Sequence, residues 1–305
     1  MSTARRIFFI IIIISLSIPF RQSTLHAADH VRAQEKALHK KYHEIEKRLS
    51  KNQFGIPLHI ESYEESNALR VDIYGIFGYP YDYMRSTLQS PENWCDIALL
   101  HLNVKACTHH TLNGDTLLTF YSGRKFYQRL EETYQLSYRY HLFAAHPEYL
   151  NIALAADEGP LHTKDHRLRL EAVPLEKEST FVHFSYAYSY NFLGEITIKS
   201  YFATIGRDKV GFSIIDTDSQ GNPVYIGGVR GAIERNAVRY YLAIQAYLDT
   251  VHLPEEQRFE RRLSRWYDLT DRYRLQLFEV EKEEYIKNKK REYQNQIMLQ
   301  KKLLP

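Results

Sequence analysis

The sequence is poor in cysteine and in excess charge. Its 305 residues include two Cys and two Trp, and the formal net charge is +3. The first 27 residues hold Arg5, Arg6 and Arg21 and no acidic residue, so the remaining chain is formally neutral. Because nucleic-acid-binding domains normally present a basic face, we expect no nucleic-acid partner.

A hydrophobic run long enough to cross a bilayer is also lacking. The apolar segment near the N-terminus extends from Ile7 to Phe20, which is short of the roughly 20 apolar residues that span a membrane. Two arginines precede it and small residues follow it, an arrangement typical of a secretory signal peptide. We therefore predict cleavage after Ala27 or Ala28 and a periplasmic or otherwise exported protein.

Complete motifs for nucleotides, metals and nucleophiles are missing as well. The glycines at 227, 228 and 231 do not fit the dinucleotide pattern, because Ile226 stands where its first Gly is required. The segment Asp216–Gly221 resembles the start of a calcium loop, but Gly227 occupies the position of the bidentate acid. No Walker loop and no His-Glu-x-x-His motif occurs. We expect no cofactor and no metal.

The two cysteines, Cys95 and Cys107, both follow the predicted cleavage site. In an oxidising compartment a closely spaced pair usually forms a disulfide, and we predict one here. One alternative is a metal site made by Cys107 with His109 and His110, to which His101 could be added, although adjacent residues of a strand point to opposite faces. Another alternative is a nucleophilic cysteine paired with a histidine.

Alternating apolar and polar residues dominate the chain from Leu58 to Ile226. Such alternation indicates strands with one packed face and one wet face, as in an antiparallel sheet. The clearest segments are 69–77, 134–142, 150–154, 167–172 and 181–190. Two helices, Tyr81–Gln89 and Pro91–His101, interrupt the strands; Pro91 suits the first position of a helix.

Helical spacing marks both ends of the chain. Residues 29–50 carry an apolar stripe, for which docking on the domain is the default interpretation. Residues 229–251 form a long amphipathic helix that ends before Pro254. Residues 255–303 continue as charged helix, and we expect the last part to be frayed or a solvated extension.

Tyrosine is the most unusual component, with 24 Tyr and 15 Phe against two Trp. A tyrosine ring is apolar and its hydroxyl is polar, which suits a cavity wall as well as a sheet face or a core. In the segment 181–190 the aromatic residues share one face, and residues 183, 185, 187 and 189 share the other. The aromatic face could therefore line a ligand chamber.

The order of these elements resembles the START-like superfamily, also called SRPBCC, over about residues 58–251. The matching features are the strand at 69–77, the two helices after it and the helix at 229–251. The resemblance implies an α+β helix-grip fold, in which an antiparallel sheet curls around a long C-terminal helix and leaves an apolar cavity. A possible helical insert at 193–205 and the extra N- and C-terminal helices depart from the pattern. The resulting division is a signal peptide (1–28), an N-terminal helix (29–57), the START-like domain (58–251) and a charged helical extension (252–305).

The leading functional hypothesis is an exported, non-catalytic protein that holds a lipid or another apolar small molecule between sheet and long helix. The residues expected at this site are the wall residues Tyr186, Tyr188, Tyr240 and Ile244 and, at a polar end, Arg235 and Asn236. One alternative is an envelope enzyme acting on an apolar substrate with Glu234 or His183 as acid–base groups. Another is a scaffold whose terminal helices bind a membrane surface or a protein partner.

Overall fold

The computed structural model describes residues 20–303 except 177, 192–193 and 195–208. Most of the predicted signal peptide and, apart from Gly194, the predicted insert at 193–205 therefore lie outside the described residues. No helix in the described part is long and apolar enough to cross a membrane.

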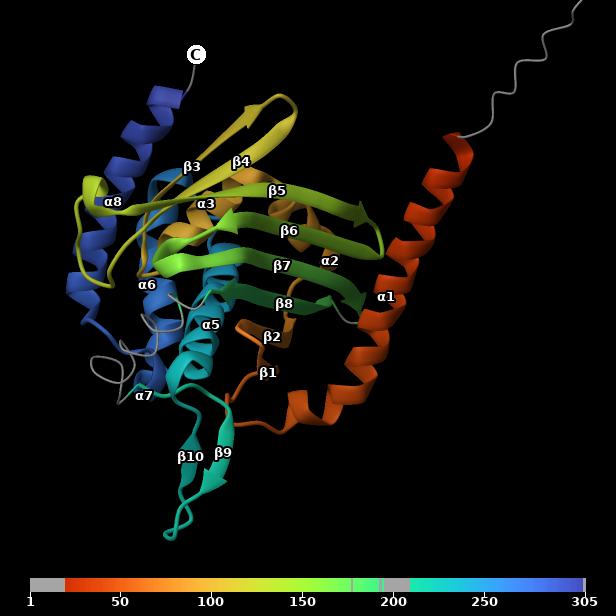
Figure 1. Ribbon diagram of the computed structural model, residues 1–305, viewed down its shortest axis with the longest axis horizontal. Coiled ribbons are helices and arrows are strands. Elements are labelled where there is room, and N and C mark those ends of the chain that lie inside the picture. The colour runs from red at the N-terminus through yellow and green to blue at the C-terminus, as the bar shows by residue number, and fades with distance from the viewer. Residues whose placement is uncertain (1–19, 177, 192–193, 195–208, 304–305) are drawn as a thin grey trace, which may run out of the picture.

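One antiparallel sheet of eight strands forms the centre of the molecule, in the order β1-β2-β8-β7-β6-β5-β4-β3 (Figure 1). Every neighbouring pair is antiparallel. The strands are β1 (Leu58–Glu65), β2 (Ala68–Phe77), β3 (Val104–Leu112), β4 (Asp115–Ser122), β5 (Tyr134–His146), β6 (Tyr149–Glu158), β7 (Thr163–Leu175) and β8 (Ser179–Tyr190). The alternating segments of the sequence thus fall on strands, as predicted.

The long helix α5 (Gly228–Leu248) crosses one face of this sheet, which we call the inner face. Its close approach to β2 depends on Gly75, because a Cβ at this position would lie 2.0 Å from the Tyr241 hydroxyl oxygen. The helices α2 (Tyr81–Leu88) and α3 (Pro91–Leu100) contribute to the same core. The predicted α+β class, with a sheet around a long C-terminal helix, is confirmed.

The N-terminal helix α1 (Phe20–Ser50) packs on the opposite, outer face of the sheet. Its buried residues Leu38, Ile45 and Leu49 form a small core with strand residues that include Tyr74 and Phe181. The apolar stripe predicted for residues 29–50 therefore docks on the domain.

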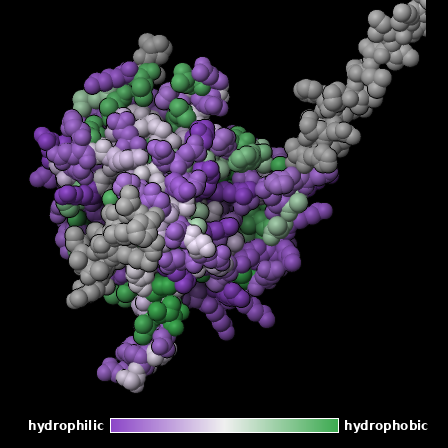
Figure 2. Space-filling view, in the orientation of Figure 1, coloured by the Kyte–Doolittle hydropathy of each residue, from purple (hydrophilic) through white to green (hydrophobic). Residues whose placement is uncertain are grey.

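A two-stranded hairpin, β9 (Ile214–Thr217) and β10 (Pro223–Tyr225), projects from the molecule ahead of α5 (Figure 1). Figure 2 shows hydrophobic side chains gathered at the base of this hairpin. Ile214, Ile215 and Val224 are exposed there. Short 3₁₀ turns at Leu130–Glu132 and Pro160–His162 precede β5 and β7.

The C-terminal helices are α6 (Glu255–Asp271), α7 (Arg274–Leu277) and α8 (Lys282–Leu303). The expectation of a frayed or solvated end is wrong for α8, which packs along the edge strand β3. The side chain of Gln296 accepts a hydrogen bond from the Cys107 amide at 2.8 Å. Gln300 accepts from the His109 amide at 2.9 Å and donates to the His109 carbonyl at 2.8 Å. The two glutamines thus act as a partner for the unpaired edge.

Buried ion pairs hold the same helix. Glu292 lies between Lys105 of β3, at 3.1 Å, and Lys289, at 2.7 Å. All three side chains are 1 % exposed, and the Lys289 ammonium also donates to the carbonyls of His101 and Val104. These contacts are polar, so the apolar spacing of the sequence gave no sign of them.

Cys95 of α3 and Cys107 of β3 form a disulfide, with their Cα atoms 4.9 Å apart. The predicted bond is therefore confirmed, and it joins the helix to the edge of the sheet. Neither sulfur is free to act as a metal ligand or a nucleophile.

Candidate functional site

Four tyrosines from three elements meet between the inner face and α5. Tyr138 lies on β5, Tyr186 and Tyr188 lie on β8, and Tyr240 lies on α5. The Tyr186 ring centroid is 5.5 Å from that of Tyr188 and 6.4 Å from that of Tyr240. We call these four residues the tyrosine cluster. Three of them are predicted wall residues, and the structure brings them together.

The hydroxyl groups of this cluster are poorly paired. The Tyr186 hydroxyl lies 3.3 Å from His166 Nδ1, and His166 Nε2 lies 2.8 Å from the Thr163 hydroxyl. The hydroxyls of the other three tyrosines make no hydrogen bond within the described residues. None of these three hydroxyl oxygens is among the buried polar atoms that lack a partner, so each keeps accessible surface. They are therefore available to donate or accept a hydrogen bond with another molecule.

The tyrosine cluster is largely removed from water. Burial raises the pKa of Tyr138, Tyr186, Tyr188 and Tyr240, because the charged phenolate would lose its hydration. Three of the four rings nevertheless retain accessible surface, and Tyr138 is 2 % exposed. The four side chains are therefore largely desolvated, and three of them keep part of their surface accessible.

The apolar end of this region is closed. A hollow of about 10 Å³, enough for at most one water, lies between the sheet and α5. Its lining includes Phe184, Tyr240 and Ile244, together with Trp94 and Ile97 of α3. Ile244 is fully buried and packs into this filled core. Tyr186, Tyr188 and Asn236 do not line this hollow and keep accessible surface.

The two residues expected at a polar end differ in placement. Asn236 is partly exposed, one helical turn before Tyr240, and its Oδ1 lies 3.5 Å from Arg239 Nη1. Arg235 is 3 % exposed and donates to the Val210 carbonyl at 3.0 Å. Asn236 thus borders the tyrosine cluster, whereas the described contact of Arg235 ties the helix to the preceding segment. Their role in binding stays a prediction.

The proposed acid–base residues do not join the tyrosine cluster. Glu234 is fully buried and accepts hydrogen bonds from Ser62, at 2.5 Å, from the amides of Phe212 and Ser213, at 2.6 and 2.9 Å, and from the Ser213 hydroxyl, at 2.7 Å. These bonds make it an anchor between α5, β1 and the segment before β9.

His183 lies on the outer face, in a network of charges. Its Nε2 donates to Asp72 at 2.7 Å and its Nδ1 donates to Glu171 at 2.9 Å. Burial acts to lower the His183 pKa, but these hydrogen bonds hold it above 6.5. Arg70 pairs with Asp72 at 2.8 Å, and Tyr149 donates to Glu171. Every charge in this network has a partner.

A wider open hollow of about 530 Å³ adjoins this network between α1, β1 and β2. Its lining is polar and includes Lys41, Glu61 and Arg70. Lys41 and Glu61 pair across it at 2.9 Å. Such a surface suits water rather than an apolar molecule.

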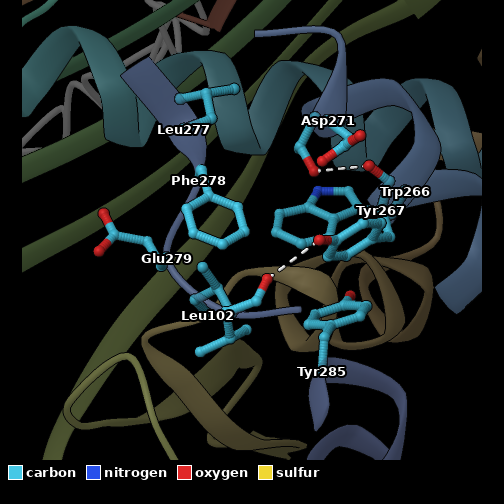
Figure 3. Close-up of a pocket in the computed structure, with 10 residues that line it drawn as sticks. Leu102, Trp266, Tyr267, Asp271, Leu277, Phe278, Glu279 and Tyr285 are labelled. Carbon is cyan, nitrogen blue, oxygen red and sulfur yellow. Dashed lines mark hydrogen bonds between the residues drawn. The ribbon is translucent and has the colours of Figure 1, made fainter. Parts of the chain in front are cut away.

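A further hollow, of about 10 Å³, lies among the C-terminal helices (Figure 3). Within it, the Tyr267 hydroxyl donates to the Val280 carbonyl at 3.0 Å. The lining residues are Leu102, Trp266, Tyr267, Thr270, Asp271, Leu277, Phe278, Glu279, Val280 and Tyr285. The space is too small for a ligand. Over the described residues, no cluster of three His, Cys, Asp or Glu could hold a metal ion.

Sequence reasoning missed Tyr138 and His166 as neighbours of the predicted wall, although both lie on the strands it identified. Tyr138 follows the same alternation as Leu136 and Tyr140. It also missed two cations, the part-buried Lys125 and the buried Arg239, because they are far apart in sequence.

No protein-family model and no curated protein matches the sequence. The chain is similar in structure to a human StAR-related lipid transfer protein (TM-score 0.36, 10% identity, 74% of this chain and 99% of the other). It is also similar to a conserved protein of unknown function from Enterococcus faecalis (TM-score 0.36, 9% identity, 69% of this chain and 89% of the other). A third similar structure is norcoclaurine synthase from Thalictrum flavum (TM-score 0.32, 13% identity, 46% of this chain and 79% of the other).

Proposed function

We propose that this protein is exported and binds an apolar or amphipathic small molecule between the inner face of its sheet and α5, without catalysing a reaction. The observation that carries the proposal is the tyrosine cluster, in which three hydroxyls have no hydrogen-bond partner among the described residues. Because their oxygens are accessible, a ligand could bond to them without breaking a hydrogen bond within the protein.

The composition of the site favours a ligand with apolar body and few polar atoms. The rings of Tyr186, Tyr188 and Tyr240 and the neighbouring Phe184 offer apolar contact, while the free hydroxyls offer oriented hydrogen bonds. Small-molecule sites are generally built in this way. Lipids and other amphiphiles fit this description.

A catalytic role has less support. An enzyme would require a carboxylate or imidazole that changes charge near neutral pH within reach of the ligand. The imidazole beside Tyr186 is His166, and burial lowers its pKa to about 4. Glu234 and His183 are held by protein groups elsewhere. The scaffold hypothesis also has less support, because side chains of α8 bind β3 of the same chain rather than facing a partner.

Native mass spectrometry of mildly purified protein is the first test, and we expect a bound small molecule. We also expect uptake of a fluorescent fatty-acid analogue. A homogeneous empty protein that takes up no such probe would overturn the proposal. Export is tested by the mass of the protein in the envelope, which should correspond to a chain starting at Ala28 or Asp29.

Phenylalanine variants separate binding from stability. Tyr188→Phe and Tyr240→Phe remove unpaired hydroxyls, so we expect unchanged or slightly raised stability and about three- to tenfold weaker probe binding. Tyr140→Phe is the matched control, because its hydroxyl donates to the Gln89 carbonyl at 2.6 Å. It should cost about 1 kcal/mol of stability and leave binding unchanged. The reverse pattern would show that the hydroxyls have no role in binding.

A further inference from the structure

A group of positive charges lies next to the tyrosine cluster, and within the described residues a single carboxylate pairs with it. Glu279, which follows α7, is shared by three cations. Arg239 of α5 lies 3.0 Å from it, Lys209 lies 3.5 Å from it, and Lys125, from the segment after β4, also contacts it. Arg239 is 1 % exposed. We call Lys125, Arg239 and His101 the cationic end of the site.

The shortage of negative charge affects the cations themselves. Desolvation and the neighbouring Arg239 lower the pKa of Lys125 to about 8. Desolvation lowers the pKa of Arg239 to about 10, with Glu279 opposing the shift. A buried cation is stable only when it is paired and hydrogen-bonded. Within the described residues, one carboxylate is shared by three cations, so the group keeps positive charge that a second anion would balance.

Two hydrogen-bond donors at this end also lack acceptors. His101 is 2 % exposed, and its Nδ1 accepts from the Asn103 amide at 3.1 Å. Burial and the nearby cations hold its pKa well below 6.5, so the ring is neutral and Nε2 carries the proton. Neither this N–H nor that of Arg239 Nε has a partner among the described residues.

The cationic end is continuous with the tyrosine cluster. The His101 ring stacks on the Tyr240 ring, with centroids 4.4 Å apart. Arg239 Nη1 approaches Asn236 Oδ1 at 3.5 Å, and Asn236 and Tyr240 retain accessible surface on the same side of α5. The two groups of residues are therefore adjacent through His101, Tyr240 and Asn236.

We infer that the ligand is an anionic amphiphile, with an apolar chain against the tyrosine cluster and a carboxylate or phosphate group at Lys125, Arg239 and His101. This inference rests on the proposed function. An anion here would accept from the ammonium, the guanidinium and the unpaired imidazole N–H at once. Such charge-assisted hydrogen bonds are about twice as strong as neutral ones.

Calorimetric titration of the purified protein with three compounds of equal chain length tests the inference. These are dodecanoate, dodecyl phosphate and the neutral 1-dodecanol. We expect at least tenfold tighter binding of one or both anions than of dodecanol, and the tighter anion identifies the head group. If no compound binds, the proposed function fails as well. If dodecanol binds as tightly as both anions, only the present inference is overturned.

Matched variants locate the head group. Lys125→Gln should weaken anion binding at least tenfold and leave dodecanol binding unchanged. Lys41→Gln is the control, because Lys41 has the same side-chain exposure of 25 % and also pairs with a glutamate, on the outer face. It should change neither affinity. Equal weakening of anion and alcohol by Lys125→Gln would mean that the cationic end is structural.

A variant that should strengthen anion binding separates loss of the head-group contact from a general loss of structure. Glu279→Gln removes the carboxylate that the cations share. The empty protein should lose stability, whereas the anion should bind at least threefold more tightly and dodecanol should bind as before. Weaker binding of the anion by Glu279→Gln would overturn the inference, since damage to the fold would also weaken dodecanol.

Discussion

The polar side chains on the two faces of the sheet differ in how many of their polar atoms have a hydrogen-bond partner. On the outer face, both nitrogens of His183 meet carboxylate oxygens, which can only accept, so the ring is an imidazolium. Asp72 and Glu171 each have an arginine as well. On the inner face, phenol groups and a neutral imidazole are left without acceptors. The completed pairs of the outer face support a structural role there, and the unpaired groups of the inner face support the proposed site.

The charge of His183 predicts how stability depends on pH. Its folded-state pKa lies above the unfolded value of 6.5. Its contribution is therefore complete below pH 6.5 and is lost as pH rises through the folded-state pKa. We expect His183→Gln to cost about 1.5–3 kcal/mol at pH 6, and less at higher pH. Urea unfolding of both proteins between pH 6 and 9 measures the difference.

His166 supplies the contrast, because burial lowers its pKa to about 4. The stability linked to its neutral ring is present above pH 6.5 and is lost as pH falls toward 4. The difference between wild type and His166→Gln should therefore shrink on acidification, opposite in sign to that for His183. Parallel slopes for the two variants would contradict both assignments.

Among the elements, α3 and β3 are held together by the disulfide. Replacing Cys95 by Ser should cost about 2–4 kcal/mol in oxidised protein, because the unfolded chain regains the freedom of the closed loop. With reductant present, wild type and variant should unfold at nearly the same urea concentration. Thiol counting on denatured wild-type protein provides the check, and two free thiols without reductant would show that the bond is absent.

The contact of α8 with β3 predicts an effect of two glutamines. Gln296→Ala with Gln300→Ala leaves the amides of Cys107 and His109 without acceptors. The double variant also loses the bond from Gln300 to the His109 carbonyl. We expect a loss of about 3 kcal/mol, at about 1 kcal/mol per hydrogen bond, and faster hydrogen exchange at both amides. Gln294→Ala is the control, because Gln294 is exposed on the same helix. Unchanged exchange in the double variant would mean that α8 does not cover this edge in solution.

Helices and strands were predictable where one face is buried, because their apolar residues then recur at a regular spacing. The aromatic face of 181–190 and the apolar positions of 229–251 face the core, so their spacing reveals strand β8 and helix α5. The attachment of α8 was not predictable in this way. Glutamines that bond to a strand edge and a buried Lys–Glu–Lys group have the composition of a solvated helix.

For the whole molecule, the candidate site was predictable only in part. Tyr186, Tyr188 and Tyr240 follow from the faces of two elements. The cationic end joins His101 from the end of α3, Lys125 from the segment after β4 and Arg239 from α5. No local pattern links residues so far apart, because the fold alone brings them together. The same holds for Glu279, whose carboxylate pairs with Lys125 and Arg239.

The final prediction concerns the helix that covers the outer face after export. Predicted cleavage after Ala27 or Ala28 falls within α1 but before Leu38 and Ile45, which pack against the sheet. The mature protein should therefore keep this helix docked. Ile45→Ala in exported protein should cost about 2–5 kcal/mol through lost burial and the cavity left behind. Glu46→Ala, on the exposed side of the same helix, should cost little. Equal stability of both variants, or a mature chain that starts beyond residue 50, would contradict a docked helix in the exported protein.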